Sequence, residues 1–305
     1  MRGIMEPFAR AYYELRFQVS FMERGQTDFQ GFFSEVMEKR YPSDFQRVRP
    51  WGNVGDQKND GYLKSLRMLF QVYAPNEMAA SKAILKVHED FHGALPYWEK
   101  YFDNWVFVHN SMQGLGPDVL AKLLELGGYN PSISVTHWGY EELRQQTFGM
   151  TEADIASLLG PVPSTRDIVD LRFESLRDVL LVIAGQEPLD ELDIRPVPAD
   201  KLSQNSLSAN TRILLKAGMH KADLVGQFFE NWPLDPGLGD KVAETFRKTY
   251  ETLRDARVMP DAIFERLYEF AGGRHLSSPS HQVAVLAVLA YFFEQCDIFE
   301  ATQPE

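Results

Sequence analysis

The pattern of apolar residues changes about halfway along the chain, and this change constrains the fold most. In the first half, short runs of aromatic and β-branched residues alternate with longer stretches of helical periodicity. Strands are expected over 45–49, 68–73, 106–109 and 133–136, and helices over 5–24, 27–40, 77–98, 117–126 and 138–148. From residue 151 onward, strand patterns are nearly absent, and helices are expected over 151–159, 165–184, 208–218, 221–230, 238–257, 260–271 and 279–295. These patterns predict an α/β N-terminal domain, with a mixed sheet flanked by helices, and an all-α C-terminal domain.

The chain length supports this division. Single cores seldom grow beyond roughly 250–300 residues, and this chain has 305 residues. We place the boundary near residue 160, which gives domains at 1–160 and 161–305. One cysteine, Cys296, offers no internal disulfide. The charged N-terminus resembles no signal peptide, and the most apolar run, 283–293, is about half the roughly 20 residues of a membrane span. We expect a cytoplasmic protein with no membrane contact.

Charge is distributed unevenly between the two halves. The whole chain carries a net charge of −12, of which residues 1–149 hold −2 and residues 150–305 hold −10. Within the first half, residues 38–67 contain seven Lys or Arg against four Asp or Glu. This local surplus is where a polyanion is expected to dock, although it is also compatible with an ordinary solvated surface. The acidic second half suits a protein partner better than DNA.

A short motif at residues 88–92 matches the zinc-peptidase pattern H-E-x-x-H. Zinc would be bound there by His88 and His92, one helical turn apart. We reject this interpretation because Asp90 would place a carboxylate on the buried side of the motif and no third histidine follows. A zinc hydrolase would require stoichiometric zinc that is lost in His88→Ala.

A more informative set of residues begins at Glu35 and runs to Lys86, in the order helix, strand, strand, strand, helix. Asp60 follows a glycine-rich turn, and Gln71 lies on the next strand. Together with Glu35 on the preceding helix, these side chains offer the oxygen ligands that Mg²⁺, or alternatively Mn²⁺, prefers. Such a metal activates water for phosphodiester cleavage, and a nearby lysine assists.

These residues resemble a known family. The string G-x-x-G-D-x-x-N-D-G-Y, followed by F-Q-x-Y, is similar to the core of the restriction-endonuclease-like (PD-(D/E)xK) superfamily, in the Mrr-like branch. The resemblance implies that Asp60 is the metal-binding aspartate, Gln71 the second motif position and Glu35 the helix glutamate. The family's lysine position is Tyr73 here. Either the lysine has moved to the next helix, at Lys86 or Lys82, or the domain binds nucleic acid without cutting it.

A second resemblance covers the other half. The passages 205–208, 250–254 and especially LAYFFEQCDIFE at 289–300 are similar to the helical C-terminal domain of effectors in bacterial ABC-three-component systems, including Lamassu-type antiphage systems. The resemblance implies two partners, an SMC-like ABC ATPase and a small middle subunit. The residues at 283–292 also follow the spacing of an ordinary core helix.

The sequence therefore predicts an antiphage effector that cleaves DNA. Glu35, Asp60 and Gln71 would hold Mg²⁺, Lys86 would stabilise the transition-state charge, and the DNA backbone would be positioned by Arg47, Arg49 and Lys58. We also expect a homo-oligomer when the effector is active. The alternative is a non-catalytic adaptor of the same kind of complex, which is indicated by Tyr73.

Overall fold

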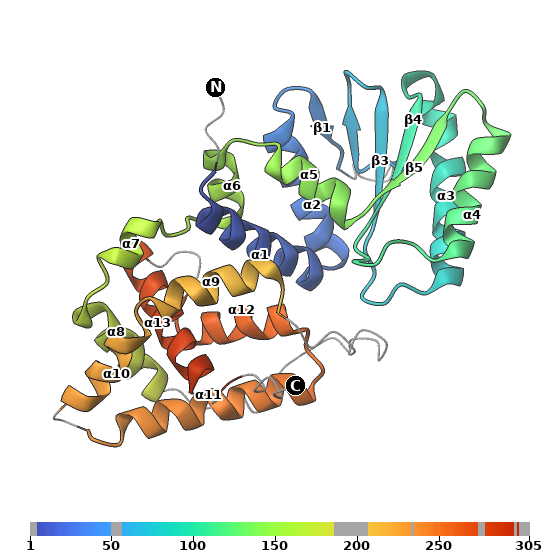
Figure 1. Cartoon of the computed structure of the whole chain (residues 1–305). Coiled ribbons are helices and arrows are strands. Elements are labelled where there is room, and N and C mark those ends of the chain that lie inside the picture. Colours follow the sequence, from blue (N-terminus) through green and yellow to red (C-terminus); the bar gives the residue numbers. More distant parts are fainter. Residues whose placement is uncertain are drawn as a thin grey trace. The chain divides into compact units, whose positions relative to one another are not determined.

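The computed structural model describes residues 5–49, 57–185, 207–232, 235–273, 278–295 and 298. The chain divides into two compact units. The sheet unit is Ser20–Leu158, and the helical unit combines Met1–Val19 with Leu159–Glu305 (Figure 1). Cys296 lies outside the described residues.

The sheet unit contains the helix–strand–strand–strand–helix order expected from the sequence. Its elements, in chain order, are α2 (Gln26–Arg40), β1 (Phe45–Arg47), β2 (Gly61–Leu63), β3 (Met68–Tyr73), α3 (Ala80–Trp98), η2 (Glu99–Tyr101), β4 (Asn104–His109), α4 (Pro117–Tyr129), β5 (Ser134–Trp138), α5 (Tyr140–Phe148) and α6 (Glu152–Leu159). Strand β3 has the bounds predicted from its aromatic and β-branched run.

The five strands form one mixed sheet in the order β1-β2-β3-β4-β5. Strand β2 is antiparallel to both β1 and β3, whereas β3, β4 and β5 are parallel to one another. The parallel strands are joined by α3 and α4, as crossover connections require. In the antiparallel pair of β2 and β3, Gly61 lies opposite Phe70. Asp60, the residue before β2, therefore lies next to the C-terminal part of β3.

Helices cover both faces of this sheet (Figure 1). On one face, α3 and α4 bury a core with Leu69, Trp105 and Phe107 of the strands. On the other face, α2 packs against β3 through the rings of Phe33 and Phe70, whose centroids lie 5.3 Å apart. Because side chains alternate along a strand, Leu69, Gln71 and Tyr73 face the α3 layer while Phe70 faces α2. This alternation decides where the candidate site residues lie.

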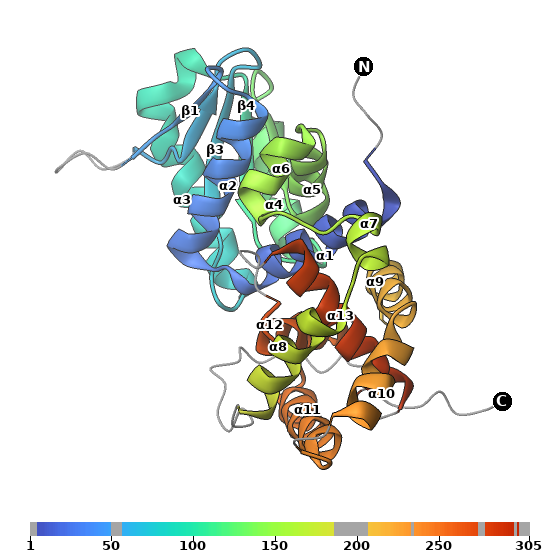
Figure 2. The ribbon, with the colours of Figure 1, turned by 90° about the vertical axis from the view of Figure 1, so that its left-hand side faces the viewer.

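The helical unit is built around one apolar helix. Its described helices are α7 (Thr165–Val169), α8 (Phe173–Ala184), α9 (Ala209–Met219), α10 (Ala222–Asn231), α11 (Leu238–Asp255), α12 (Pro260–Phe270) and α13 (Pro279–Glu294). Helix α13 is buried almost all round, as expected for a helix with apolar residues on every side (Figure 2). The predicted core helix at 279–295 is confirmed. None of the helices that the structure describes is long and apolar enough to cross a membrane.

The first helix, α1 (Pro7–Glu23), differs in its placement from the sequence prediction. We assigned it to the N-terminal domain, but residues up to Val19 belong to the helical unit. A buried polar network explains this placement. Arg16 donates to the carbonyls of Leu159 and Pro161 at 3.0 Å and to Gln282 Oε1 at 3.1 Å, while Tyr12 donates to the hydroxyl of Tyr268 at 2.8 Å.

The predicted single helix at 165–184 is broken into α7 and α8. Helix α7 ends at Val169, and Arg172 has an extended backbone, with φ −127° and ψ 166°, as the N-cap of α8. Between them, the side chain of Leu171 is buried in the core. Periodicity alone did not reveal this break because the apolar spacing continues through it.

Candidate active site

Asp60 is a buried carboxylate at the junction of β2 and β3. Its side chain is 3% exposed. The Oδ2 atom accepts a hydrogen bond from the backbone N–H of Val72 at 2.6 Å, and Oδ1 accepts one from the side-chain amide of Gln30 on α2. The backbone N–H of Asp60 donates to the carbonyl of Phe70 at 2.9 Å. Asp60 is therefore held against β3 by the backbone of Phe70 and of Val72, the two residues that flank Gln71.

Two buried residues near Asp60, one next to it in the chain and one across the strand register, each have a side-chain atom without a hydrogen-bond partner among the described residues. Gln71, 4% exposed, leaves its Oε1 unpartnered, and Asn59, 0% exposed, leaves its Nδ2 unpartnered. Asn59 Oδ1 accepts from the backbone N–H of Gly61 at 3.0 Å. An unpartnered buried acceptor is unfavourable unless it meets a ligand or water. Both side chains carry oxygen atoms of the kind that Mg²⁺ prefers, but the Asp60 carboxylate contacts Gln30 of α2 whereas Gln71 lies on the sheet face that carries α3, so the contacts described here do not join the two predicted ligands.

The segment that carries Asp60 has an uncommon backbone. Gln57 and Lys58 both lie in the left-handed region, with φ of 53° and 61°, and neither is a glycine. Such conformations persist only where the surrounding structure holds them, and they gather at functional sites. In this segment the side chain of Lys58 reaches Asp90 on α3, and the side chain of Asp60, two residues later, contacts α2 and β3.

Lys58 and Lys86 share one buried partner, Asp90. Each lysine Nζ lies 2.9 Å from Asp90 Oδ1, and the Asp90 side chain is 0% exposed. Lys86 also lies 2.8 Å from Oδ2, an ion-pair contact rather than an aligned hydrogen bond. Lys86 and Asp90 are one turn apart on α3, whereas Lys58 belongs to the loop before β2. The structure therefore brings two predicted site lysines together around an aspartate.

Glu35 is exposed and is not among the residues that contact Asp60. Burial lowers the pKa of Arg24, and the negative charge of Glu35 offsets part of this lowering, together with Glu23 and Asp28. The α2 residue that contacts Asp60 is Gln30, which lies about 140° around the helix axis from Glu35. The structure thus places Asp60 opposite Gln71 in the strand register only, and places Glu35 on a different side of α2 from Gln30.

The remaining predicted residues occupy exposed or packed positions. Arg47 on the edge strand β1 and Arg49 just after it are exposed, as is Lys82 on α3. Tyr73 is half-buried, and its ring centroid lies 5.9 Å from that of Phe107 on β4. Burial raises the pKa of the Tyr73 phenol. Tyr73 is therefore a neutral phenol at the position where the resemblance in the sequence predicted a lysine.

The histidines of the H-E-x-x-H motif lie on an exposed side of α3. The His88 and His92 ring centroids are 4.3 Å apart, and His92 Nδ1 lies 2.9 Å from the carbonyl of His88. Asp90 lies on the buried side, as the sequence analysis expected. In the part of the chain that the structure describes, no three His, Cys, Asp or Glu side chains are grouped to hold a metal ion.

A second histidine pair lies at the ends of two parallel strands. His109 on β4, 0% exposed, has its Nε2 atom 3.3 Å from Nδ1 of His137 on β5. His109 Nδ1 accepts from the backbone N–H of Ser111 at 3.2 Å, so Nε2 carries the proton of the neutral ring. Burial, assisted by His137, lowers the pKa of His109 to about 3. This proton assignment leaves no nitrogen lone pair of His109 for a metal.

Sequence reasoning missed Gln30, Asn59 and Asp90 as members of the site. The spacing of Lys86 and Asp90, four residues apart on a helix, was a usable signal for an ion pair. No local pattern indicated Gln30, because its contact with Asp60 depends on how α2 packs on the sheet.

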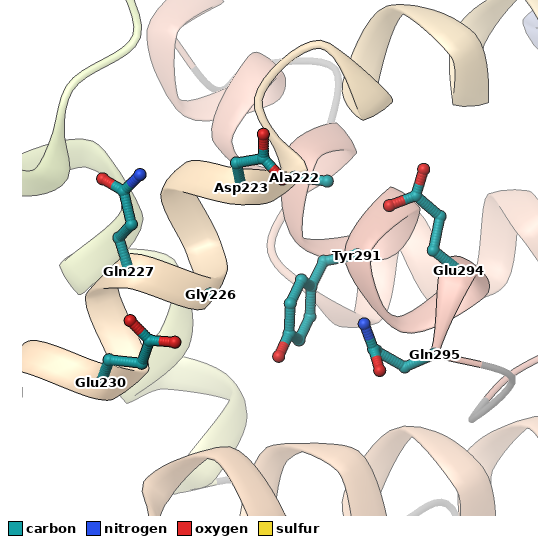
Figure 3. A pocket seen from close by; sticks show the side chains of 8 residues that line it. All are labelled: Ala222, Asp223, Gly226, Gln227, Glu230, Tyr291, Glu294 and Gln295. Atoms are coloured by element: carbon teal, nitrogen blue, oxygen red, sulfur yellow. The ribbon is translucent and has the colours of Figure 1, made fainter.

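The helical unit has a depression of about 270 Å³ between α10 and α13 (Figure 3). Asp223, Gln227 and Glu230 of α10 line one side, and Tyr291, Glu294 and Gln295 of α13 line the other. Figure 3 shows the ring of Tyr291 between the two helices. Three of the residues that line this small depression, Asp223, Glu230 and Glu294, are carboxylates, so the depression disfavours anions.

Comparison with known families gives one match. Residues 174–300 match C-terminal domain 10 of the ABC-three component (ABC-3C) systems. The matched region contains α9 to α13 and most of α8, and it covers less than half of the chain. The match supports membership of the chain in an ABC-3C system, in which it works with other subunits. No curated protein and no solved structure is significantly similar to the chain.

Proposed function

We propose that the chain is an antiphage effector of an ABC-3C system, of the Lamassu type, and that its sheet unit hydrolyses DNA phosphodiester bonds with Mg²⁺. The observation that carries the proposal is the buried Gln71 Oε1, which has no hydrogen-bond partner among the described residues and whose residue lies across the strand register from the buried Asp60. A restriction-endonuclease-like fold would account for this pair, and the observed order α2, β1, β2, β3, α3 is the order expected for it.

In this proposal, Asp60 and Gln71 would hold Mg²⁺, and Mn²⁺ would replace it. When bound, the metal would supply an activated water and a positive charge at the scissile phosphate. The hydrogen bonds from Val72 and Gln30 orient the Asp60 carboxylate before any metal arrives. Lys86 lies on α3 and would stabilise negative charge on the phosphate. Glu35 remains a predicted third ligand, although its exposed side chain acts on Arg24 in this structure.

The exposed cations of the sheet unit would hold the DNA backbone. Arg47, Arg49 and Lys58 are partly or fully exposed on β1 and on the loop before β2. The helical unit would bind an SMC-like ABC ATPase and a small middle subunit, as its ABC-3C match favours, and its acidic character suits protein contacts. The proposed compartment is the cytoplasm, and the active form is proposed to be a homo-oligomer.

The test uses the full chain assembled with its partner subunits. Linear double-stranded DNA is incubated with Mg²⁺, Mn²⁺ or EDTA, and Asp60→Asn is compared with the wild type. The asparagine oxygen can still accept from the N–H of Val72 while the variant loses the charge that a metal needs, and circular dichroism checks that the fold is kept. We expect metal-dependent cleavage by the wild type and none by the variant. Asp103→Asn is the matched control, because Asp103 is an exposed partner of Arg67. Full cleavage by Asp60→Asn would disprove the assignment.

A second candidate function is a nucleic-acid-binding adaptor without catalysis, and it is favoured by Tyr73, which is packed on Phe107 where a lysine is expected. An adaptor would bind DNA and the partner subunits equally well after Asp60→Asn. Titration calorimetry with Mg²⁺ separates the two functions, because an adaptor shows no binding that depends on Asp60. Metal binding lost in Asp60→Asn would favour the nuclease.

A further inference from the structure

The two edge strands of the sheet unit differ in how they are protected. Among the described strands, β1 forms one edge of the sheet and β5 forms the other. Edge strands are commonly kept short or given charged residues or proline, because their free backbone groups can pair with another chain. Strand β1 has three residues and carries Arg47, whereas β5 has five residues without charge or proline. The surrounding stretch 130–139 also contains no Asp, Glu, Lys or Arg, in a chain of net charge −12.

The backbone pairing of β5 shows which of its residues face outward. The N–H of Ser134 donates to the carbonyl of Asp103 at 2.8 Å, so Ser134 directs its backbone groups toward β4. Because alternate residues of a strand pair with opposite sides, Thr136 and Trp138 also pair with β4. Val135 and His137 therefore direct their N–H and C=O groups away from the sheet. In the part of the chain that the structure describes, no strand pairs with this side of β5.

The flank of α4 next to this edge is apolar and exposed. A Cβ atom added at Gly127 would lie 3.7 Å from Cβ of Val135, so Gly127 marks the flank of α4 that lies over β5. Leu120 and Leu124 lie within about 60° of Gly127 around the helix axis. Their side chains are 40% and 66% exposed. The charged residues of α4 lie on the opposite flank and are Asp118, Lys122 and Glu125.

This edge is complementary to a second copy of itself. If two β5 strands pair antiparallel across a two-fold axis, Val135 of one copy lies opposite His137 of the other. Every outward-facing residue of both strands then exchanges both of its backbone hydrogen bonds. Thr136 lies opposite its own copy at the axis, with Cα atoms about 4.5 Å apart, and paired threonines are favourable across strands. Both copies of α4 lie on the same face of the joined sheet, so their leucine flanks meet.

We propose that β5 and the Leu120–Leu124 flank of α4 form a two-fold interface between two copies of this chain. The occupant is a second copy because the register that satisfies the outward-facing backbone groups is symmetric. The absence of charge at this edge also lets two acidic chains approach without like charges meeting. The inference deepens the homo-oligomer of the proposed function, and it depends on neither metal nor DNA.

The test measures the mass of the free full chain by sedimentation equilibrium over a series of micromolar concentrations. We expect a reversible monomer–dimer equilibrium for the wild type. Thr136→Lys and Thr136→Glu each place two like charges opposite each other at the axis, and each should weaken the dimer about tenfold. An equimolar mixture of the two variants should form dimers at least as tight as the wild type, because lysine then faces glutamate. Thr136 is exposed, and circular dichroism checks that both variants keep the fold.

A substitution away from the axis provides a second test. Leu124→Gln should weaken the dimer about tenfold, because an apolar side chain is no longer buried in the interface. The matched control for the threonine variants is Gln46→Lys, at an exposed position of the other edge strand, β1. Leu85→Gln is the control for Leu124→Gln, since Leu85 is a 57% exposed leucine on α3. Both controls should leave the equilibrium unchanged.

A wild-type chain that stays monomeric, or a dimer that the Thr136 and Leu124 variants leave unchanged, would overturn the interface. A mixture of Thr136→Lys and Thr136→Glu that stays monomeric would overturn the two-fold register. Cleavage is not measured in this experiment. A failed interface with intact metal-dependent cleavage leaves the proposed nuclease standing, and an intact interface without cleavage points to the adaptor.

Discussion

Gln71 is the residue whose behaviour in solution reports most directly on the candidate site. Its buried Oε1 has no partner, so in EDTA the Gln71→Leu variant should be more stable than the wild type by about 1 kcal/mol. Adding Mg²⁺ should raise the free energy of unfolding of the wild type and not that of the variant, because a ligand stabilises only the state that binds it. Thermal or urea unfolding with and without Mg²⁺ measures both effects.

Gln46→Leu is the control for this prediction, since Gln46 is exposed on β1 and its removal should have little effect. A loss of stability in Gln71→Leu in EDTA would show that Gln71 has a partner inside the protein. In that case the unpartnered acceptor would not support a cation site.

His109 gives the sheet unit a predictable dependence on pH. Its folded-state pKa of about 3 lies below its ordinary value of 6.5, so between these values the unfolded chain binds a proton that the folded chain does not. Lowering the pH therefore favours unfolding. The contribution between pH 7 and pH 5 is about 2 kcal/mol. Urea unfolding at the two pH values should show a smaller difference in His109→Gln than in the wild type.

His92→Gln is the matched control, because His92 is exposed on α3. Its pH dependence should equal that of the wild type. An unchanged pH dependence in His109→Gln would mean that the folded protein accommodates the charged ring, contrary to its burial.

How far the sequence predicted the candidate site can be judged from single residues. Asp60 and Gln71 were predicted as site residues because a glycine-rich turn and an aromatic strand flank them, and both signals are local; the structure shows that both side chains are buried. The burial of Asp90 was also expected from its helical position. Its role between two lysines was not, because Lys58 reaches it from another element. Gln30 was missed for the same reason, since its partner lies 30 residues away.

At the scale of elements, helices α9 and α13 of the helical unit cross closely at Gly218. A Cβ atom added at Gly218 would lie 2.4 Å from the carbonyl oxygen of Leu286, and neither backbone can move without disturbing the core. Gly218→Ala should therefore lower the free energy of unfolding by about 1–3 kcal/mol. Urea unfolding followed by circular dichroism measures this loss.

Gly31 on α2 is the matched control, because no atom lies within 4 Å of an added Cβ there. Alanine at Gly31 should stabilise its helix by about 0.5–1 kcal/mol. Equal effects of the two substitutions would show that the α9–α13 crossing is looser than the structure indicates.

The elements themselves were largely predictable from periodicity. Helix α13 and strand β3 were expected near their observed bounds because long apolar patterns dominate them. The separation of α7 from α8 was not expected, because it arises from Leu171 turning into the core. The sheet order and the direction of β2 depend on non-local pairing and were not contained in local patterns.

At the scale of the whole molecule, the division into two units crosses the N-terminal helix. The sequence placed residues 1–160 in one domain, but a helix carries no local signal for the partner it packs against. Arg16 identifies that partner, since its guanidinium holds two backbone carbonyls and the side chain of Gln282.

Arg16→Leu should therefore weaken the helical unit specifically. The variant leaves the carbonyls of Leu159 and Pro161 without this donor in a buried setting, which should lower the free energy of unfolding by about 2–4 kcal/mol. Hydrogen exchange of backbone amides measures where the loss falls. Protection should decrease in α12 and α13 while α3 and α4 keep theirs, because the two units have separate cores. Arg247→Leu on the exposed side of α11 is the control and should change protection little. An equal decrease in α3 and α4 would mean that both units unfold as one cooperative body. In that case α1, which contributes residues to both units, would couple the unfolding of one unit to the unfolding of the other.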